Sequence, residues 1–264
     1  MDNNVNIQLA KLVSTFQRID LLEAQKARLM QRIDSKYVIQ MDLLEEILRR
    51  VSDSYLVVEV NGETMPEYIS DYYDTYDMNM YHDHQRKRPK RYKIRLRHYC
   101  SSGDSFLEVK FKMPSGKTDK QRILVKQSEL GYPSTFDFIK SNTPYDISQL
   151  NKTLVTRFNR ITLVGKDFNE RVTIDLNLQL SIPDAAQSIA FNQVCVIEIK
   201  RNREKKNSKL AQVLKEMGIR PHSFSKYSIG CAILYPNLKK NSFKETLLYL
   251  EKINHFTDLK RQCA

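Results

Sequence analysis

Charged residues occupy every second position in residues 91–97 and again in residues 108–112. In chain order they are Arg91, Lys93, Arg95, Arg97, Glu108, Lys110 and Lys112. Successive side chains of a β-strand point to opposite faces, so two strands joined by the Ser-Ser-Gly-Asp turn between them would place these charges on one face. Arginine forks and lysine ammonium groups on such a wall could bind the oxygens of a phosphate chain. A hairpin whose charged face meets water fits the same pattern, so this stretch alone leaves both interpretations open.

Three further predicted strands combine one apolar face with one basic face that also carries an acid. Their polar residues are Asp34 with Lys36, Arg171 with Asp175, and Glu198 with Lys200. We therefore predict an α+β fold in which about eight antiparallel strands close into a barrel, with a basic lumen inside and helices outside. A linear polyphosphate with divalent cations would neutralise such a lumen, and a glutamate could hold Mg²⁺ or Mn²⁺.

Composition narrows the class of partner. The chain has 264 residues, with 43 Lys and Arg against 31 Asp and Glu, which gives a net charge of +12. That excess favours a polyanion: nucleic acid, an anionic membrane or a phosphate-rich molecule. No apolar run reaches the roughly 18 residues of a membrane span, and the first residues do not resemble a secretory signal. The four cysteines lack CxxC spacing, which predicts reduced thiols in a cytoplasmic protein.

The order of elements predicts one main domain. Residues 5–31 carry apolar side chains at three- and four-residue steps without Pro or Gly, which predicts a single amphipathic helix. We therefore divide the chain into an N-terminal helix at residues 1–31 and one domain at residues 32–264, since no repeat or linker separates the later elements. The basic run at residues 85–93 is typical of a nucleic-acid patch, or of an exposed approach to the hairpin.

Eight short motifs together resemble a known family, and the resemblance covers roughly residues 36–230. They are Ser35-Lys36-Tyr37, Tyr73-Asp74-Thr75, Arg95-Leu96-Arg97, Glu108-Val109-Lys110, Phe158-Asn159-Arg160, Arg171-Val172-Thr173-Ile174-Asp175, Glu198-Ile199-Lys200 and Ser225-Lys226-Tyr227. In number, order and spacing they resemble the triphosphate tunnel metalloenzyme superfamily. The resemblance is closer to its VTC branch, the polyphosphate-polymerase domain of the vacuolar transporter chaperone.

The resemblance implies a role for each residue of the basic faces. The phosphate chain would be bound by Lys36, Arg95, Arg97, Lys110, Arg160, Arg171 and Lys226. Glu198 would hold a divalent cation, Mn²⁺ or Mg²⁺. Lys112 and Lys200 stand at further positions where contacts with the chain are expected.

Two departures from the family pattern limit what can be carried over. The CYTH-type triphosphatases of the superfamily begin with Glu-x-Glu-x-Lys, whereas here Arg32 and Asp34 precede Lys36. This strand therefore carries fewer of the acidic residues that help hydrolysis than the strand of the CYTH-type triphosphatases, as is also the case in the VTC branch. Eukaryotic VTC proteins also carry a phosphate-sensing SPX domain and membrane helices, and we find neither here, so we carry over neither regulation nor membrane-coupled translocation.

Three functions remain open at this stage. The first is a metal-dependent polyphosphate polymerase that transfers the γ-phosphate of ATP to a growing chain. The second is a triphosphatase that acts on inorganic or organic triphosphate, with water as the acceptor. The third is a non-catalytic polyphosphate or polyanion binder, which the basic run favours. The expected partners are ATP and polyphosphate or triphosphate, whereas nucleic acid is disfavoured because we find neither RNP-type aromatic strands nor a helix-turn-helix pattern.

Overall fold

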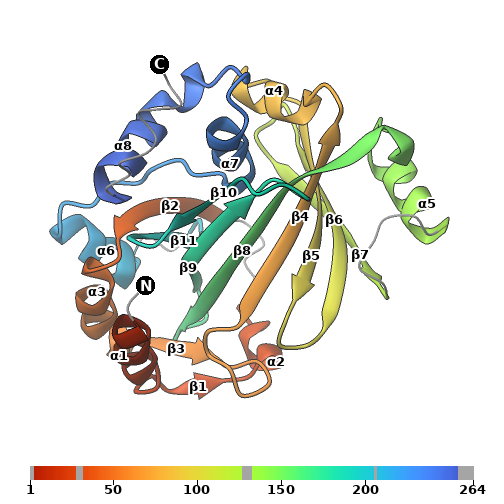
Figure 1. Ribbon diagram of the computed structural model, residues 1–264. Helices are drawn as coiled ribbons and strands as arrows, with labels where there is room; N and C mark the ends of the chain where they lie inside the picture. The colour runs from red at the N-terminus through yellow and green to blue at the C-terminus, as the bar shows by residue number, and fades with distance from the viewer. Residues whose placement is uncertain (1–2, 28–31, 127–132, 205–206, 255–264) are drawn as a thin grey trace.

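One β-sheet forms the centre of the computed structural model, which describes residues 3–27, 32–126, 133–204 and 207–254 (Figure 1). The sheet has eleven strands, and its main path is antiparallel throughout. The order along that path is β2 (Arg32–Gln40), β11 (Val194–Asn202), β9 (Glu170–Ser181), β8 (Leu150–Gly165), β4 (Glu67–Thr75), β5 (Arg91–Tyr99), β6 (Asp104–Lys112) and β7 (Thr118–Val125). The predicted α+β class with antiparallel strands is confirmed.

Three short strands lie off the main path. β1 (Arg18–Ile19) pairs in parallel with β3 (Tyr55–Val58), and β3 pairs with β8. β10 (Ser188–Phe191) pairs with β9. These strands widen the sheet on the side of its longest members, β8 and β9.

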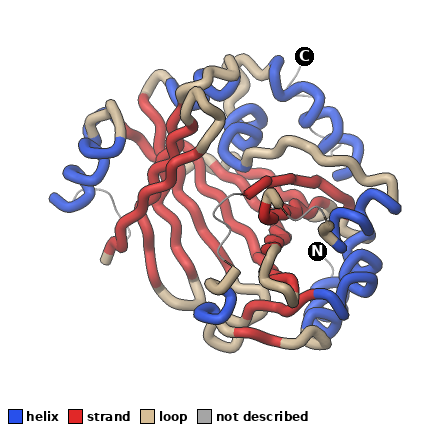
Figure 2. The backbone as a smooth tube through the Cα atoms, turned by 180° about the vertical axis from the view of Figure 1, so that it is seen from behind, coloured by secondary structure: helices blue, strands red, loops and turns tan. Residues whose placement is uncertain are grey.

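The prediction of a closed barrel of about eight strands is wrong. Within the described residues no backbone ladder joins the two ends of the path, β2 and β7, so the sheet is open (Figure 2). Most side chains of β7 are exposed, and Lys120 and Arg122 among them are the kind of charged residues that protect a free sheet edge from pairing. The alternation of apolar and charged residues along a strand predicts which face each side chain occupies, but it carries no information on whether the two end strands of the sheet meet.

The sheet nevertheless curves around the face that bears Arg95, which we call the inner face. Lys110 on β6 and Glu198 on β11 affect each other's pKa, although four strands separate β6 from β11 along the sheet. Beyond the effect of burial, Lys36 on β2 likewise lowers the pKa of Lys93 on β5. Charges on both halves of the sheet therefore face a common space.

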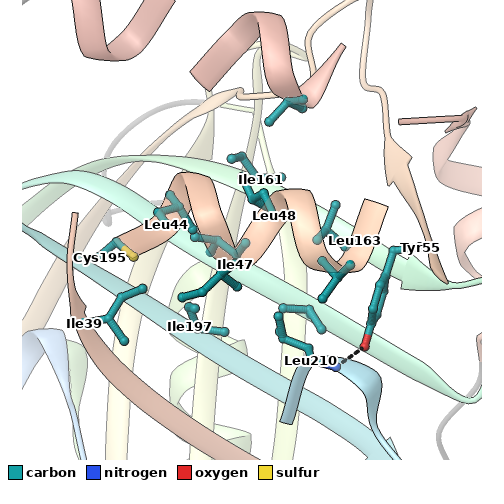
Figure 3. Close-up of a cluster of buried hydrophobic side chains, with 14 of the residues drawn as sticks. Ile39, Leu44, Ile47, Leu48, Tyr55, Ile161, Leu163, Cys195, Ile197 and Leu210 are labelled. Carbon is teal, nitrogen blue, oxygen red and sulfur yellow. Dashed lines mark hydrogen bonds between the residues drawn. The ribbon is translucent and has the colours of Figure 1, made fainter. Parts of the chain in front are cut away.

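Helices cover the apolar outer face. α1 (Asn3–Val13), α3 (Leu43–Val51) and α6 (Lys209–Glu216) contribute to one buried cluster on it. In Figure 3, Leu44, Ile47 and Leu48 of α3 lie beside Ile161 of β8 and Ile197 of β11. This core fixes the strands whose opposite faces carry the charges.

Helix α5 (Pro133–Asn142) covers the outer face at β5 and β6, whereas α7 (Lys226–Leu234) and α8 (Lys244–Asn254) lie at one end of the inner face. α5 places Ile139 in a cluster with Ile94 and Leu107. α7 packs on the inner face so closely that a Cβ at Gly230 would lie 2.6 Å from Leu154 of β8. α8 joins the same cluster as α7. No helix in the described part of the chain is both long and apolar enough to cross a membrane.

The single helix predicted over residues 5–31 is wrong. α1 ends at Val13, where the hydroxyls of Ser14 and Thr15 donate to main-chain carbonyls of the last turn, and such bonds compete with helix continuation. After β1, Asp20 caps the short helix α2 (Leu21–Ala24) by accepting a hydrogen bond from the Glu23 main chain. The last residues of the predicted helix, 28–31, lie outside the described residues.

Candidate functional site

Strand registers bring the predicted basic residues together on the inner face. The predicted hairpin of β5 and β6 is present, with Arg91 opposite Lys112, Lys93 opposite Lys110, and Arg95 opposite Glu108. On the other half of the sheet the inner positions of four neighbouring strands, β2, β11, β9 and β8, align in the same way. There Lys36 is opposite Glu198, Lys200 is opposite Arg171, and Arg160 is opposite Asp175.

The carboxylate of Glu108 is fully buried between two cations. Arg95 donates to it from Nε at 2.7 Å and lies 2.5 Å away through Nη2, and the ammonium group of Lys120 on β7 forms a second ion pair. Burial would raise the pKa of Glu108, but Arg95, Arg97 and Lys120 outweigh it and hold this pKa well below its usual range. Glu108 is thus a fixed negative charge that holds Arg95 and Lys120 in place.

Asp175 plays the same part for a second pair of cations. Arg160 donates to its two carboxylate oxygens at 2.6 and 2.9 Å, and Lys226 donates to one of them. Arg160 and Lys226 outweigh the effect of burial and hold the pKa of Asp175 well below its usual range. The ring of Phe158 lies beside both cations, 4.4 Å from the Lys226 ammonium nitrogen and 5.2 Å from the Arg160 guanidinium carbon.

Lys226 reaches this cluster from a helix. Ser225 caps α7 by accepting a hydrogen bond from the main chain of Ser228, so Lys226 is the first residue of the helix and its side chain extends over the inner face. The Ser225 hydroxyl also accepts a hydrogen bond from Lys93 of β5 at 2.8 Å. Lys36 of β2 donates to the neighbouring carbonyl of Phe224 at 3.2 Å. The start of α7 therefore connects β2 with β5.

Glu198 is the most accessible of the three central carboxylates. Its side chain is 21% exposed, against 0% for Glu108 and 4% for Asp175. Lys200 lies 3.3 Å and Lys36 3.8 Å from its oxygens. Burial would raise the pKa of Glu198, but Lys36 and Lys200 outweigh it and keep the group ionised. This carboxylate is the one that an incoming cation can reach.

Several cations of the inner face form no ion pair with a carboxylate among the described residues, and Arg97 and Lys110 are two of them. Arg97 is only 6% exposed, and it donates a hydrogen bond from Nε to the hydroxyl of Ser70. Burial lowers the pKa of Arg97 to about 10, and Arg95 and Arg160 add to the shift. Arg95 is the main cause of a strongly lowered pKa at Lys110, followed by burial. Buried charges without a counter-charge are costly, so this space is built to receive an anion.

The remaining predicted residues lie at the two ends of the inner face. Arg171 is partly buried, and burial followed by Arg160 lowers its pKa. Lys112 lies opposite Arg91 at the other end, where it is one of four cations that lower the pKa of His84 on α4 (Asn79–Gln85). All ten predicted site residues thus lie on or reach the inner face.

Four cations of this face, Arg91, Lys93, Lys120 and Arg122, were not assigned to the site from the sequence. Lys93 was placed on the correct face of the hairpin but was not assigned to the site; burial, then Lys36 and Arg91, lowers its pKa to about 7. Burial also lowers the pKa of Lys120 to about 8. Arg122 lies over the ring of Phe106 at 4.7 Å. The two-residue spacing of Lys120 and Arg122 in β7 was the available signal.

A divalent cation would have to be held mainly by its phosphate ligands. The described residues contain no group of three or more His, Cys, Asp or Glu side chains that could hold a metal ion. Mg²⁺ commonly takes one or two protein carboxylates and fills its other positions with water and substrate phosphates. The accessible carboxylate of Glu198, inside a cationic wall, fits that pattern.

The family model of the VTC domain matches residues 31–235. The chain belongs to the VTC domain family. The resemblance inferred from the eight motifs is therefore confirmed, and every residue that we assigned to the site lies within the matched region. A search of curated proteins found no match.

The chain is also similar to solved structures at low sequence identity. A candidate adenylate cyclase from Bacillus halodurans is 13% identical, with a TM-score of 0.50 over 74% of this chain and 94% of its own. A candidate adenylyl cyclase from Hippeastrum, described as having a dominant triphosphatase activity, is 14% identical, with a TM-score of 0.49 over 77% and 96%. A candidate adenylate cyclase from Vibrio parahaemolyticus is 12% identical, with a TM-score of 0.47 over 78% and 99%. We take only the fold from this comparison, and only from the Bacillus halodurans structure.

Proposed function

We propose that this VTC-domain protein is a metal-dependent polyphosphate polymerase that transfers the γ-phosphate of ATP to a growing inorganic polyphosphate chain. The observation that carries the proposal is the set of inner-face cations that have no carboxylate partner among the described residues, Arg97 and Lys110 among them, beside clusters whose cations are already held in place. Such an array matches a linear chain of phosphates better than a single compact anion. Membership of the VTC family supports the same substrate class.

In this proposal the residues act by position and charge. The terminal oxygen of the acceptor chain attacks the γ-phosphorus of ATP, the bond from that phosphorus to the β–γ bridging oxygen breaks, and ADP leaves. Arg95 and Arg160, each fixed by a buried carboxylate, would hold the reacting phosphates in line, and Arg97 would stabilise the charge on their oxygens. Preorganised cations of this kind require no nucleophilic side chain.

Glu198 would hold the divalent cation, together with the phosphates themselves. When bound, that cation would supply charge neutralisation between neighbouring phosphates. Lys36 and Lys200 flank Glu198 and would contact the same phosphate oxygens. We place the reaction in the cytoplasm, where ATP is available and where free thiols such as Cys195 and Cys231 stay reduced.

The test is to incubate the protein with ATP and Mn²⁺, with and without a pyrophosphate primer, and to follow the products by ³¹P NMR. We expect a mid-chain phosphate signal to grow as ADP appears, and we expect chelation of the metal to stop it. Arg160→Ala and Glu198→Gln should each lower the rate by at least about a hundredfold, because removal of one preorganised charge-stabilising group typically has that effect. Arg157→Ala is the matched control, since Arg157 lies on the same strand but pairs with Glu67 at an exposed position.

Other outcomes would replace the proposal. Orthophosphate as the only product would make the protein a triphosphatase, with water as the acceptor. Binding of tripolyphosphate without turnover of any triphosphate would make it a non-catalytic polyanion-binding module. A rate that Arg157→Ala lowers as much as Arg160→Ala would show that the inner face is not the reaction site.

A further inference from the structure

The basic run noted in the sequence forms an ordered loop at one end of the inner face. Residues 86–90, which we call the basic loop, connect α4 to β5. Main-chain hydrogen bonds fix it, from Arg86 to the His82 carbonyl, from Lys87 to that of His84 and from Arg88 to that of Asp83. The side chains of Lys87, Arg88 and Lys90 are exposed. The basic loop therefore presents cations to solvent from a defined backbone.

The basic loop continues the row of cations on β5. Arg91 begins that strand, donates from Nη1 to the carbonyl of Arg88 at 2.9 Å, and lies on the same face as Lys93, Arg95 and Arg97. A strand rises about 3.3 Å per residue, so this row extends for about 20 Å from Arg97 to Arg91. A triphosphate bound near Arg95 would cover only part of that length. Only a longer chain could reach the basic loop.

Charge distinguishes the two ends of the inner face. At the end with the basic loop, Arg88 pairs with Asp83 at 3.3 Å, while Lys87 and Lys90 form no ion pair among the described residues. At the opposite end, where β2 and β9 begin, Arg32 pairs with Asp34 at 3.0 Å, and the partly buried Arg171 forms no ion pair among the described residues. What distinguishes the end with the basic loop is its two exposed lysines, which extend the row of cations into solvent and would attract a long polyanion.

We propose that the basic loop is an exit subsite for inorganic polyphosphate chains longer than a triphosphate. The direction of chain growth that this implies rests on the proposed polymerase function, whereas the binding of long chains does not. Inorganic polyphosphate fits the loop better than single-stranded RNA does, because residues 86–90 offer no aromatic ring on which a base could stack. Exposed lysines without acidic partners are suited to a uniform row of phosphates.

The test compares long and short phosphate chains. In the variant Lys87→Ala/Lys90→Ala, affinity for long-chain sodium polyphosphate should fall about tenfold at low salt. The slope of the logarithm of the affinity against the logarithm of the salt concentration should become shallower by about one to two. Affinity for sodium tripolyphosphate should stay unchanged. The control variant Lys166→Ala/Lys209→Ala removes two exposed lysines elsewhere on the molecule and should leave both affinities unchanged. If the protein polymerises, the loop variant should keep its initial rate of ATP consumption but release shorter chains.

Each other result has a distinct meaning. Unchanged affinity for long polyphosphate, or an equal loss for tripolyphosphate, would overturn the exit subsite. Tighter binding of a single-stranded RNA oligonucleotide than of polyphosphate with the same number of phosphates, lost in the loop variant, would overturn it in favour of a nucleic-acid surface. A wild-type protein that binds long polyphosphate through Lys87 and Lys90 without making it would leave the subsite standing and overturn only the polymerase function.

Discussion

Replacement of Asp175 by Asn should make the protein less stable but a better binder of phosphate chains. Asp175 is buried between Arg160 and Lys226, and Asn removes its negative charge while keeping its shape. Removal of one partner from a buried ion pair costs about 3–5 kcal/mol of unfolding free energy, and we expect the lower end because Asn still accepts a hydrogen bond. For a chain of this length about 3 kcal/mol corresponds to a fall in Tm of roughly 6–12 °C.

The same substitution removes an anion that competes with phosphate for these two cations. The extra net positive charge should favour binding of tripolyphosphate by roughly 1–2 kcal/mol, which is about five- to thirtyfold in affinity. Urea unfolding with and without saturating tripolyphosphate measures both effects, because the ligand should stabilise Asp175→Asn more than it stabilises the wild type. The matched control is Glu45→Gln, which breaks an exposed ion pair with Arg49 on α3 and should change stability by only a few tenths of a kcal/mol.

The pH dependence supplies a further check on Asp175. Because its folded pKa lies below its unfolded value of about 3.9, its contribution to stability is complete above that value and is lost as pH falls through the folded pKa. Asp175→Asn should therefore lose less stability in acid than the wild type does. A variant as stable as Glu45→Gln, or one that tripolyphosphate stabilises no more than the wild type, would refute the assignment of Asp175 as the charge that holds Arg160 and Lys226.

Two further predictions concern groups next to the site. The pKa of Lys93 is about 7 when folded and near 10.4 when unfolded, so its unfolded form binds more protons between these values and stability should rise with pH across that window. Bound phosphate should return the proton to Lys93, so affinity for tripolyphosphate should fall between pH 7 and 9. Calorimetry in two buffers should detect the uptake of this proton on binding. An uptake that Lys93→Met leaves unaltered would contradict the assignment of the proton to Lys93. Gly230→Ala should lower stability by about 1–3 kcal/mol, because the new Cβ would lie 2.6 Å from Leu154 in a filled core. Thermal unfolding would measure the loss, and an unchanged Tm would show that α7 can move away from β8.

The inner face could be predicted from the sequence because strands have a period of two. That period alone places Arg95 and Glu108 on one face and Ile94 and Leu107 on the other, as the structure has them. It could not reveal that Lys226 reaches the site from a helix, since the cap at Ser225 is a local hydrogen bond that alternation does not report.

The closure of the sheet and the N-terminal helix were beyond the same reasoning. Whether β2 meets β7 depends on the accumulated twist and curvature of eight strands, which no single strand encodes. The predicted N-terminal helix failed at Ser14 and Thr15 because apolar spacing continued past side chains that end a helix through local hydrogen bonds.

The two buried carboxylates have a consequence for how a polymer could move. Glu108 lies between Arg95 and Lys120, and Asp175 lies between Arg160 and Lys226. Each cluster of one acid and two cations therefore carries a single net positive charge instead of two. A chain that is extended by one unit must also advance by one unit, and a wall of uncompensated charges would trap it in one position. Conduction through ion channels follows the same rule, because successive sites must bind strongly enough to admit an ion and weakly enough to release it. If the protein is a polymerase as proposed, the two buried acids would let the chain advance by weakening its attraction to each group of cations.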